Sequence, residues 1–82
     1  MEHPGWVYTI LCENRKLYVG WTAHDHLPRR IAQHFSGNGS KWTMQNKPLA
    51  VLAVIEGSKA LECASTAALM ARYGVESVRG AG

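Results

Sequence analysis

Four side chains in the first half of the chain have types and spacing that suit chemistry on a phosphodiester. Tyr8 and Tyr18 lie in two strand-like segments, and Arg30 and His34 follow four residues apart in a helix-like segment. Two phenols, a guanidinium and an imidazole can surround one phosphodiester, and one acidic residue would complete a metal-dependent hydrolytic site. Glu62 is our candidate for that acid.

A β-hairpin must position the two tyrosines. Residues 6–12 and 16–22 are rich in β-branched and aromatic side chains, and the segment 13–15 between them has the composition of a turn. A turn of this length places Tyr8 and Tyr18 on one face as diagonal neighbours. Gly20 would leave an open space where a phosphate or a metal can approach. The alternative is that the tyrosines are ordinary amphipathic strand residues and Gly20 marks a bulge or a site of close packing. The predicted pairs are Cys12 with Lys16, Ile10 with Tyr18, and Tyr8 with Gly20.

A helix should follow the hairpin. Leu27, Ile31 and Phe35 recur every four residues, which predicts an apolar stripe along one side of a helix. Asp25 is expected to cap this helix, Pro28 is tolerable in its first turn, and the glycine- and serine-rich residues 36–40 end it.

Arg30 and His34 lie one turn apart on the border of this stripe, in line with His26. Arg30 suits a scissile phosphate because its planar guanidinium stays charged and donates bidentate hydrogen bonds. Arg29 is expected to point toward solvent. The alternative for these side chains is that they are ordinary polar residues of a helix surface.

The second half of the chain should supply a loop, a strand and a helix. Residues 41–48 have no clear period, whereas residues 50–55 form a continuous apolar run that predicts a central strand covered on both faces. Residues 58–73 are alanine-rich and favour a helix, which Gly74 ends. The sequence therefore predicts the order β-β-α-β-α, followed by a short tail.

Glu62 falls in the first turns of this last helix, among apolar and small neighbours. Metal binding would explain an acid at such a place, because Mg²⁺ takes one or two protein carboxylates and completes its shell with waters and substrate phosphates. Stabilisation of the helix dipole by an acid near the N-terminus is the alternative. Composition does not separate the two.

The length and charge of the chain favour one small domain with a polyanionic partner. The 82 residues, with 46% hydrophobic composition, suffice for a single domain of residues 1–82, so the substrate is recognised by this domain or by a partner. The net charge is +3, and the stretch 15–47 contains only Asp25 as an acid. An ordinary solvated basic face is the alternative. Five of its basic residues are candidate nucleic-acid contacts: Arg15, Lys16, Arg29, Lys41 and Lys47.

The remaining composition predicts a cytoplasmic protein with no membrane segment. Cys12 and Cys63 are far apart, each beside apolar residues, and are expected to be buried, reduced thiols. The first residues do not have the pattern of a secretory signal. The longest apolar run, residues 49–55, is too short to cross a bilayer.

Taken in order, these segments resemble the GIY-YIG nuclease superfamily, in the form of a small stand-alone catalytic domain. Trp6-Val7-Tyr8 stands for the first motif, where the family reads Gly-Ile-Tyr, and Tyr18-Val19-Gly20 matches the second. Arg30 with His34 resembles the helix motif. The segment Gly37-Asn38-Gly39-Ser40-Lys41-Trp42-Thr43 and the closing segment from Tyr73 to Gly80, in which Ser77 replaces a frequent asparagine, resemble those of small members.

The resemblance implies an α+β fold with a three-stranded antiparallel sheet flanked by helices, and a one-metal hydrolysis of DNA that uses Mg²⁺ or Mn²⁺. Tyr18 would be the general base, although its phenol needs nearby positive charge to ionise. Tyr8 would orient Tyr18 or the water, Arg30 would stabilise the transition state, Glu62 would hold the metal, and His34 would assist at the phosphate.

Two other functions compete with this interpretation. The first is a catalytically weak or inactive nucleic-acid-binding module of the same fold. The second is a small metal or redox protein that uses the cysteines and histidines, but His24 and His26 and the separated cysteines lack the paired spacing of a zinc site. For the nuclease, a homodimer or a partner protein would supply specificity.

Overall fold

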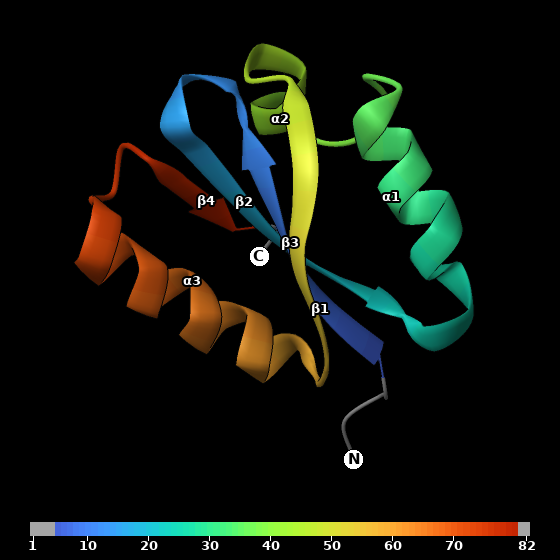
Figure 1. Cartoon of the computed structure of the whole chain (residues 1–82). Coiled ribbons are helices and arrows are strands. Elements are labelled where there is room, and N and C mark those ends of the chain that lie inside the picture. Colours follow the sequence, from blue (N-terminus) through green and yellow to red (C-terminus); the bar gives the residue numbers. More distant parts are fainter. Residues whose placement is uncertain (1–4, 81–82) are drawn as a thin grey trace.

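The computed structural model describes residues 5–80, which form one sheet with helices on both of its faces (Figure 1). The fold is α+β, as predicted. Short 3-10 turns at Glu13–Arg15 and His24–His26 follow the first two strands. The strands and helices in chain order are β1 Gly5–Cys12, β2 Lys16–Ala23, α1 Leu27–Phe35, α2 Lys41–Gln45, β3 Pro48–Glu56, α3 Lys59–Tyr73 and β4 Val78–Gly80.

The predicted hairpin register is confirmed. β1 and β2 are antiparallel, with Tyr8 opposite Gly20 and Ile10 opposite Tyr18. The turn closes because Asn14 and Arg15 adopt left-handed backbone conformations, with φ of 63° and 58°. Alternate side chains of a strand share a face, and Tyr18 is opposite Ile10, two residues from Tyr8, so the two tyrosines lie on the same side of the sheet.

The sheet has a fourth strand that the sequence analysis missed. The strand order is β3-β1-β2-β4, and β4 is parallel to β2, so the sheet is mixed rather than three-stranded and antiparallel. The predicted tail thus joins the sheet edge, where Val78 pairs with Leu17 and is fully buried. A three-residue strand is too short to show a period in the sequence.

The prediction of a covered central strand at residues 50–55 was wrong. β3 lies at one edge of the sheet and pairs only with β1, and apolar side chains such as Leu52 and Ile55 are more than half exposed. Irregularities in the β1–β3 register, between Thr9 and Ile10 and between Leu11 and Cys12, interrupt its alternation. A short apolar run does not by itself reveal a strand's place in the sheet.

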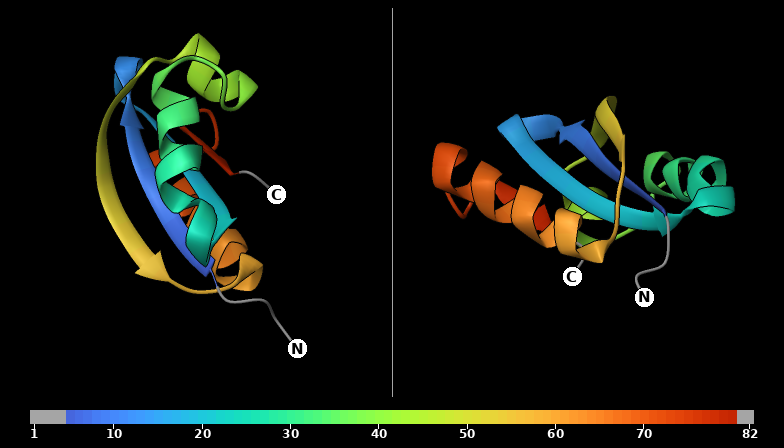
Figure 2. Two further views of the ribbon diagram at one scale, coloured as in Figure 1. Left: turned by 90° about the vertical axis from the view of Figure 1, so that its right-hand side faces the viewer. Right: turned by 90° about the horizontal axis from the view of Figure 1, so that it is seen from below.

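Different helices cover the two faces of the sheet (Figure 2). On one face, Val7, Val19 and Val78 pack with Leu69 and Met70 of α3. On the other face lies a second cluster that includes both tyrosines. Its members are Tyr8, Ile10, Cys12 and Tyr18, against which Leu27 and Ile31 of α1 and Trp42 of α2 pack.

Two local predictions were also wrong. Residues 41–45, expected to lie in a loop, form α2, because Ser40 and Thr43 make reciprocal capping hydrogen bonds at its N-terminus. Asp25 does not cap α1; it lies in the preceding 3-10 turn, and α1 has no side-chain cap. Pro28 falls in the first turn of α1, as expected.

The cysteines are both free, but only Cys12 is buried; Cys63 is exposed on α3. Burial raises the pKa of the Cys12 thiol to about 11. Among residues 5–80, no helix has the length and apolar composition that a transmembrane helix requires.

Candidate active site

Tyr8 and Tyr18 form the centre of the candidate site. Their ring centroids are 6.4 Å apart, and both side chains are almost completely buried. A Cβ atom at Gly20 would lie 2.4 Å from the hydroxyl oxygen of Tyr8, so the glycine is required by close packing. The expected open space at Gly20 is therefore filled by the Tyr8 ring, and the alternative interpretation of this glycine was correct.

A hydrogen-bonded chain leads from Tyr8 into α1 and α2. The Tyr8 hydroxyl lies 2.8 Å from His34 Nε2, and His34 Nδ1 lies 3.1 Å from Thr43 Oγ1. The Thr43 hydroxyl is also within reach of the carbonyl oxygen and the Oγ of Ser40, so it can donate to Ser40 and accept from the imidazole. In that arrangement the neutral ring has its hydrogen on Nδ1, and the Tyr8 hydroxyl donates to Nε2.

Burial disfavours the charged forms of Tyr8, Tyr18 and His34. It raises the pKa of Tyr8 to about 12, with a further rise from Tyr18 that the Arg30 guanidinium opposes. Burial also raises the pKa of Tyr18 above its ordinary value of 10.0, opposed by the Ser40 hydroxyl and by Arg30. The pKa of His34 falls to about 4, because burial and then the charge of Arg30 disfavour the imidazolium.

Arg30 is the cation of this group. It is half-buried on α1, where its Nη1 donates to Gln33 Oε1 at 3.0 Å, and its charge acts on both phenols and on the imidazole. Arg29 is exposed, as predicted. His26, which was expected in line with Arg30 and His34, is exposed in the 3-10 turn. Its Nε2 lies 3.7 Å from Asp25 Oδ1.

Glu62 enters from α3, on the opposite face of the sheet. It is only 2% exposed, its Oε2 accepts from Thr66 Oγ1 at 3.4 Å, and its Oε1 has no hydrogen-bond partner among residues 5–80. Gly80 of β4 lets Glu62 and Thr66 of α3 pack against the strand, because a Cβ at this position would lie 2.6 Å from Thr66 Oγ1 and 3.2 Å from Glu62 Oε2. A buried carboxylate oxygen without a partner is costly, and a bound cation would satisfy it.

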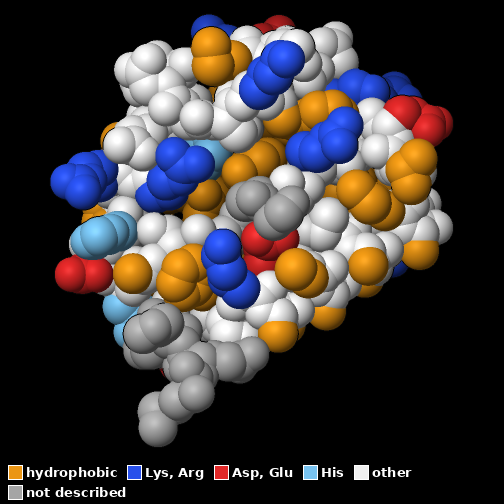
Figure 3. All heavy atoms as spheres, turned by 180° about the vertical axis from the view of Figure 1, so that it is seen from behind, with side chains coloured by type: hydrophobic (Ala, Val, Ile, Leu, Met, Phe, Trp, Pro, Cys, Tyr) orange, Lys and Arg blue, Asp and Glu red, His pale blue; other side chains and the backbone are white. Residues whose placement is uncertain are grey.

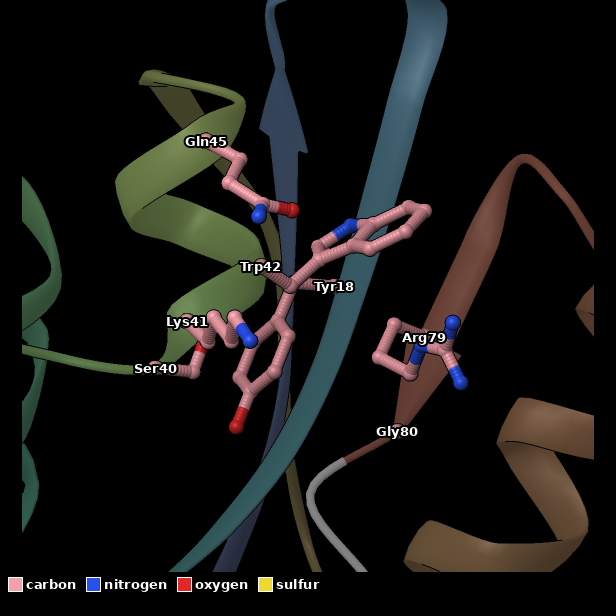
Figure 4. A pocket seen from close by; sticks show the side chains of 7 residues that line it. All are labelled: Tyr18, Ser40, Lys41, Trp42, Gln45, Arg79 and Gly80. Atoms are coloured by element: carbon pink, nitrogen blue, oxygen red, sulfur yellow. The ribbon is translucent and has the colours of Figure 1, made fainter.

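Two adjoining hollows connect Glu62 with Tyr18. The Tyr18 hollow, of about 470 Å³, lies between β2, α2 and β4 (Figure 4), and the Glu62 hollow lies between α3 and β4. Arg79 and Gly80 line both of them. The Glu62 carboxylate is close enough to Tyr8 and Tyr18 to be among the smaller causes that raise the pKa of both. Tyr8, Tyr18, Arg30 and His34 thus group on one face of the sheet, whereas Glu62 approaches from α3 and lines the neighbouring hollow.

A divalent cation fits this site with Glu62 as its protein ligand. Among residues 5–80, no group of three or more His, Cys, Asp and Glu side chains lies together as a metal cluster. Mg²⁺ does not need one, because waters and substrate phosphate oxygens complete its shell around one or two carboxylates. The unpartnered Oε1 of Glu62 is the ligand atom that such an ion requires.

The basic residues predicted to surround the site are spread more widely. Lys41 lines the Tyr18 hollow, and Lys16 lies nearby with its Nζ 5.9 Å from the centroid of the Trp42 ring. Arg15 lies in an apolar hollow on the α3 face, and Lys47 lies in a fourth hollow beside Phe35. Lys and Arg side chains accordingly border the depressed area in Figure 3 without forming one continuous patch.

Three residues contribute to the site that the sequence analysis did not select. Thr43 fixes the His34 ring, whereas Trp42 and Arg79 both line the Tyr18 hollow, with the Arg79 guanidinium carbon 5.2 Å from the indole centroid. Thr43 follows Ser40 at capping-box spacing, a signal that could have been read. Arg79 had no such signal, because its place depends on β4 joining the sheet edge.

The chain is similar to several bacterial proteins named UPF0213 protein. The one from Streptococcus pneumoniae strain TIGR4 is 31% identical over 72 residues, which cover 88% of this chain and 71% of the relative. Those from Neisseria meningitidis strain FAM18 and Xanthomonas campestris strain 8004 are 40% and 42% identical, over 70% and 61% of this chain. The matched parts are 62% and 47% of these two relatives, less than two thirds of their length. No solved structure matches the chain.

The family comparison matches residues 4–68 to the GIY-YIG catalytic domain. This region contains Tyr8, Tyr18, Arg30, His34 and Glu62, the five predicted site residues. It also contains the hairpin whose register sets both tyrosines on one face. The resemblance drawn from the motifs is therefore confirmed, and the chain belongs to the GIY-YIG family.

Proposed function

We propose that this protein is a divalent-metal-dependent endonuclease that hydrolyses phosphodiester bonds in DNA. Membership of the GIY-YIG family implies a nuclease-type function. The observation that carries the finer proposal is the buried Glu62 carboxylate, whose Oε1 is unpartnered among residues 5–80 and whose charge acts on Tyr8 and Tyr18, the two phenols that are also under the charge of Arg30. Mg²⁺ or Mn²⁺ is the cation of choice for a site with one carboxylate ligand and substrate phosphates.

Tyr18 is the general base in this proposal, because its side chain lines the hollow that a substrate would enter. In the free protein its pKa is raised, so the phenol must lose a proton before it can accept one from water. Arg30 favours the ionised form and would also stabilise negative charge on the phosphate. A cation held by Glu62 would supply further positive charge at the phosphate and the leaving oxygen.

Tyr8 and His34 have more indirect roles in this scheme. His34 is fully buried and contacts Tyr8, so we assign it as a positioning residue for the Tyr8 hydroxyl rather than as a direct phosphate contact. With its hydrogen donated to His34, the Tyr8 oxygen keeps lone pairs that can accept from the attacking water or from Tyr18. The orientation of the water would then depend on α1 and α2 as well as on the hairpin.

A nucleic-acid-binding module without turnover is the second candidate. The raised pKa of Tyr18 favours it, because a protonated phenol is not a base. Both candidates predict DNA binding, and only the nuclease predicts cleavage that depends on a divalent cation and on Glu62.

The deciding experiment compares Glu62→Gln and Arg30→Ala in cleavage and gel-shift assays over a panel of DNA structures. Glu62→Gln keeps the shape of the side chain but removes the charge that a hard cation needs, so cleavage should be lost while metal-free DNA binding persists or tightens. Arg30→Ala should slow cleavage by roughly 100- to 1,000-fold and also weaken binding.

Glu13→Gln is the matched control, because it removes an exposed carboxylate in the hairpin turn. It should cleave as the unmodified protein does. If Glu62→Gln cleaves DNA at the unmodified rate with Mg²⁺, Glu62 is not the metal ligand and the proposed site is wrong. If no DNA in the panel is cleaved by the unmodified protein with either cation, the binding module is favoured.

Repair, recombination or processing of mobile elements are the settings we propose for this activity. Specificity would come from a homodimer or from a partner protein. Analytical ultracentrifugation with and without DNA would measure the oligomeric state directly.

A further inference from the structure

The Tyr18 hollow has features that the cleavage chemistry does not use. Figure 4 shows Lys41, Trp42 and Gln45 extending from α2 on one side and Arg79 on β4 at the other, with the Tyr18 ring between them. Its volume of about 470 Å³ is within the usual range for a small-ligand site, about 300 to 1,000 Å³. None of the described residues that line it is acidic.

Trp42 is held as a rigid aromatic surface beside this hollow. Its indole Nε1 donates to the carbonyl oxygen of Leu17 at 3.1 Å, which fixes the ring on β2, while the side chain stays only partly buried. A partly exposed, oriented indole is a surface on which a flat ring can stack.

Basic groups gather around this indole. The Arg79 guanidinium lies 5.2 Å from its centroid and Lys16 Nζ lies 5.9 Å from it, and Lys41 lines the same hollow. Lys16 also donates to the carbonyl oxygen of Glu76 at 2.9 Å, whereas Arg79 and Lys41 have no ion pair among residues 5–80. Two cations without an anionic partner beside an aromatic surface suit a ligand that has both a flat ring and phosphates.

We propose that the Tyr18 hollow binds an unpaired nucleotide of the DNA substrate next to the scissile phosphate, with its base stacked on Trp42. Arg79 leaves the indole when the base arrives and, with Lys41, binds the flanking phosphates. Gln45 offers an amide to the edge of the base. This inference rests on the proposed function and specifies its substrate class, namely DNA with a single-stranded segment at the cleavage point.

The base must be unpaired for a physical reason. In a duplex each base is stacked on both sides and reaches no surface beyond the groove edges, so an indole can accept a base only where the strand is open or a nucleotide is turned out. A branch, a flap or an overhang provides such a nucleotide without the energy of opening a duplex.

The test measures binding without metal, so that it does not depend on turnover. A short oligothymidylate and a duplex of equal length are titrated against the protein, with tryptophan fluorescence and anisotropy as readouts. Oligothymidylate should bind more tightly than the duplex and quench the emission of Trp42. Trp6→Phe should retain the quenching, because Trp6 lies outside the hollow, whereas Trp42→Phe should lose it and weaken binding roughly fivefold to tenfold.

Arg79→Gln provides the second variant, with Arg72→Gln as its control. Both arginines lie over an aromatic ring, but Arg72 stacks on Tyr73 at 5.5 Å, outside the hollow. Arg79→Gln should weaken oligothymidylate binding and reduce the salt slope by about one, and Arg72→Gln should change neither. This pair keeps the test decisive even if Trp42→Phe does not fold.

Equal binding of single strand and duplex without quenching would overturn this inference. So would an unchanged affinity in Arg79→Gln. Failure of this inference is distinguishable from failure of the nuclease proposal. The nuclease proposal stands if the unmodified protein cleaves DNA and Glu62→Gln does not. If Trp42→Phe then cleaves a flap and a plain duplex in the same ratio as the unmodified protein, only the nucleotide subsite is wrong.

Discussion

The hydrogen bond between Tyr8 and His34 joins two side chains that burial keeps neutral, and it links the sheet to α1. Thr43 completes the chain to α2, so that three elements hold one phenol in place. Tyr18, and not Tyr8, lines the hollow. The orientation of the Tyr8 hydroxyl therefore matters more than its acidity.

His34 should make the stability of the protein depend on pH. Its pKa is about 4 in the folded state against 6.5 for the free side chain, so the unfolded chain takes up a proton first as the pH falls. The stabilisation is complete above pH 6.5 and is lost progressively down to pH 4, by an amount on the order of 3 kcal/mol. Urea denaturation between pH 7 and pH 4 would measure it, and His34→Gln should remove this part of the pH dependence.

His26→Gln serves as the control for this measurement, because it removes an imidazole that is exposed in the 3-10 turn. The comparison of the two variants isolates the contribution of the buried imidazole. If His34→Gln leaves the pH dependence of the unfolding free energy as it is in the unmodified protein, the buried imidazole is not the group that titrates.

At the scale of elements, the contact between α3 and β4 sets the place of Glu62. Gly80 is opposite Val19 in the sheet, and its missing side chain lets Thr66 and Glu62 come against the strand. β4 therefore has two functions, since it also presents Arg79 to both hollows. The short strand β4 adds Val78 to the core, and its contact with α3 places the Glu62 carboxylate next to the hollow that Tyr18 lines.

Gly80→Ala should separate these elements. The new Cβ would lie 2.6 Å from Thr66 Oγ1 and 2.9 Å from its Cγ2, so the helix or the strand must move, at a cost of about 1 to 3 kcal/mol of stability. Thermal unfolding would show the loss. Adding Thr66→Ala removes Oγ1 and Cγ2 and should restore part of the lost stability. The difference from additivity gives the coupling energy in a double-mutant cycle. Strictly additive effects would show that the two residues do not collide.

At the scale of the whole molecule, the net charge of +3 is less informative than its distribution. Lys41 and Arg79 line the Tyr18 hollow, whereas Arg15 lies in a hollow on the α3 face of the sheet. DNA that enters the Tyr18 hollow would meet only part of the basic residues that the sequence groups together.

DNA affinity should therefore fall steeply with salt, but not every basic residue should contribute. Lys41→Gln should weaken binding at low salt and lower the salt slope by about one, because one phosphate contact is lost. Arg15→Gln, an equal change of charge on the other side of the sheet, should have a much smaller effect. Anisotropy titrations over a range of salt concentrations measure both. An affinity that does not depend on salt, or a salt slope that falls equally in the two variants, contradicts this distribution.

The parts of the molecule that follow from short-range pattern were predictable from the sequence. The turn length and the alternation of residues 6–12 and 16–22 are enough to set the hairpin register, because a one-residue slip would move every side chain to the other face. The four-residue spacing of Leu27 and Ile31 likewise indicated the packed side of α1, but Phe35, the third residue of the predicted stripe, is 41% exposed. Together with the ordered motifs, these patterns identified the family and the residues that group at the site.

The parts that depend on long-range pairing were not predictable in this way. The apolar run of residues 50–55 is compatible with a central or an edge strand, and only its pairing with β1 alone places β3 at the edge. Residues 78–80 show no pattern of their own, yet pairing with β2 makes them a strand and brings Arg79 and Gly80 to the hollows. Burial is likewise a property of the assembled fold, so the neutral state of His34 and the unpartnered oxygen of Glu62 appear only when helices from both faces of the sheet are in place.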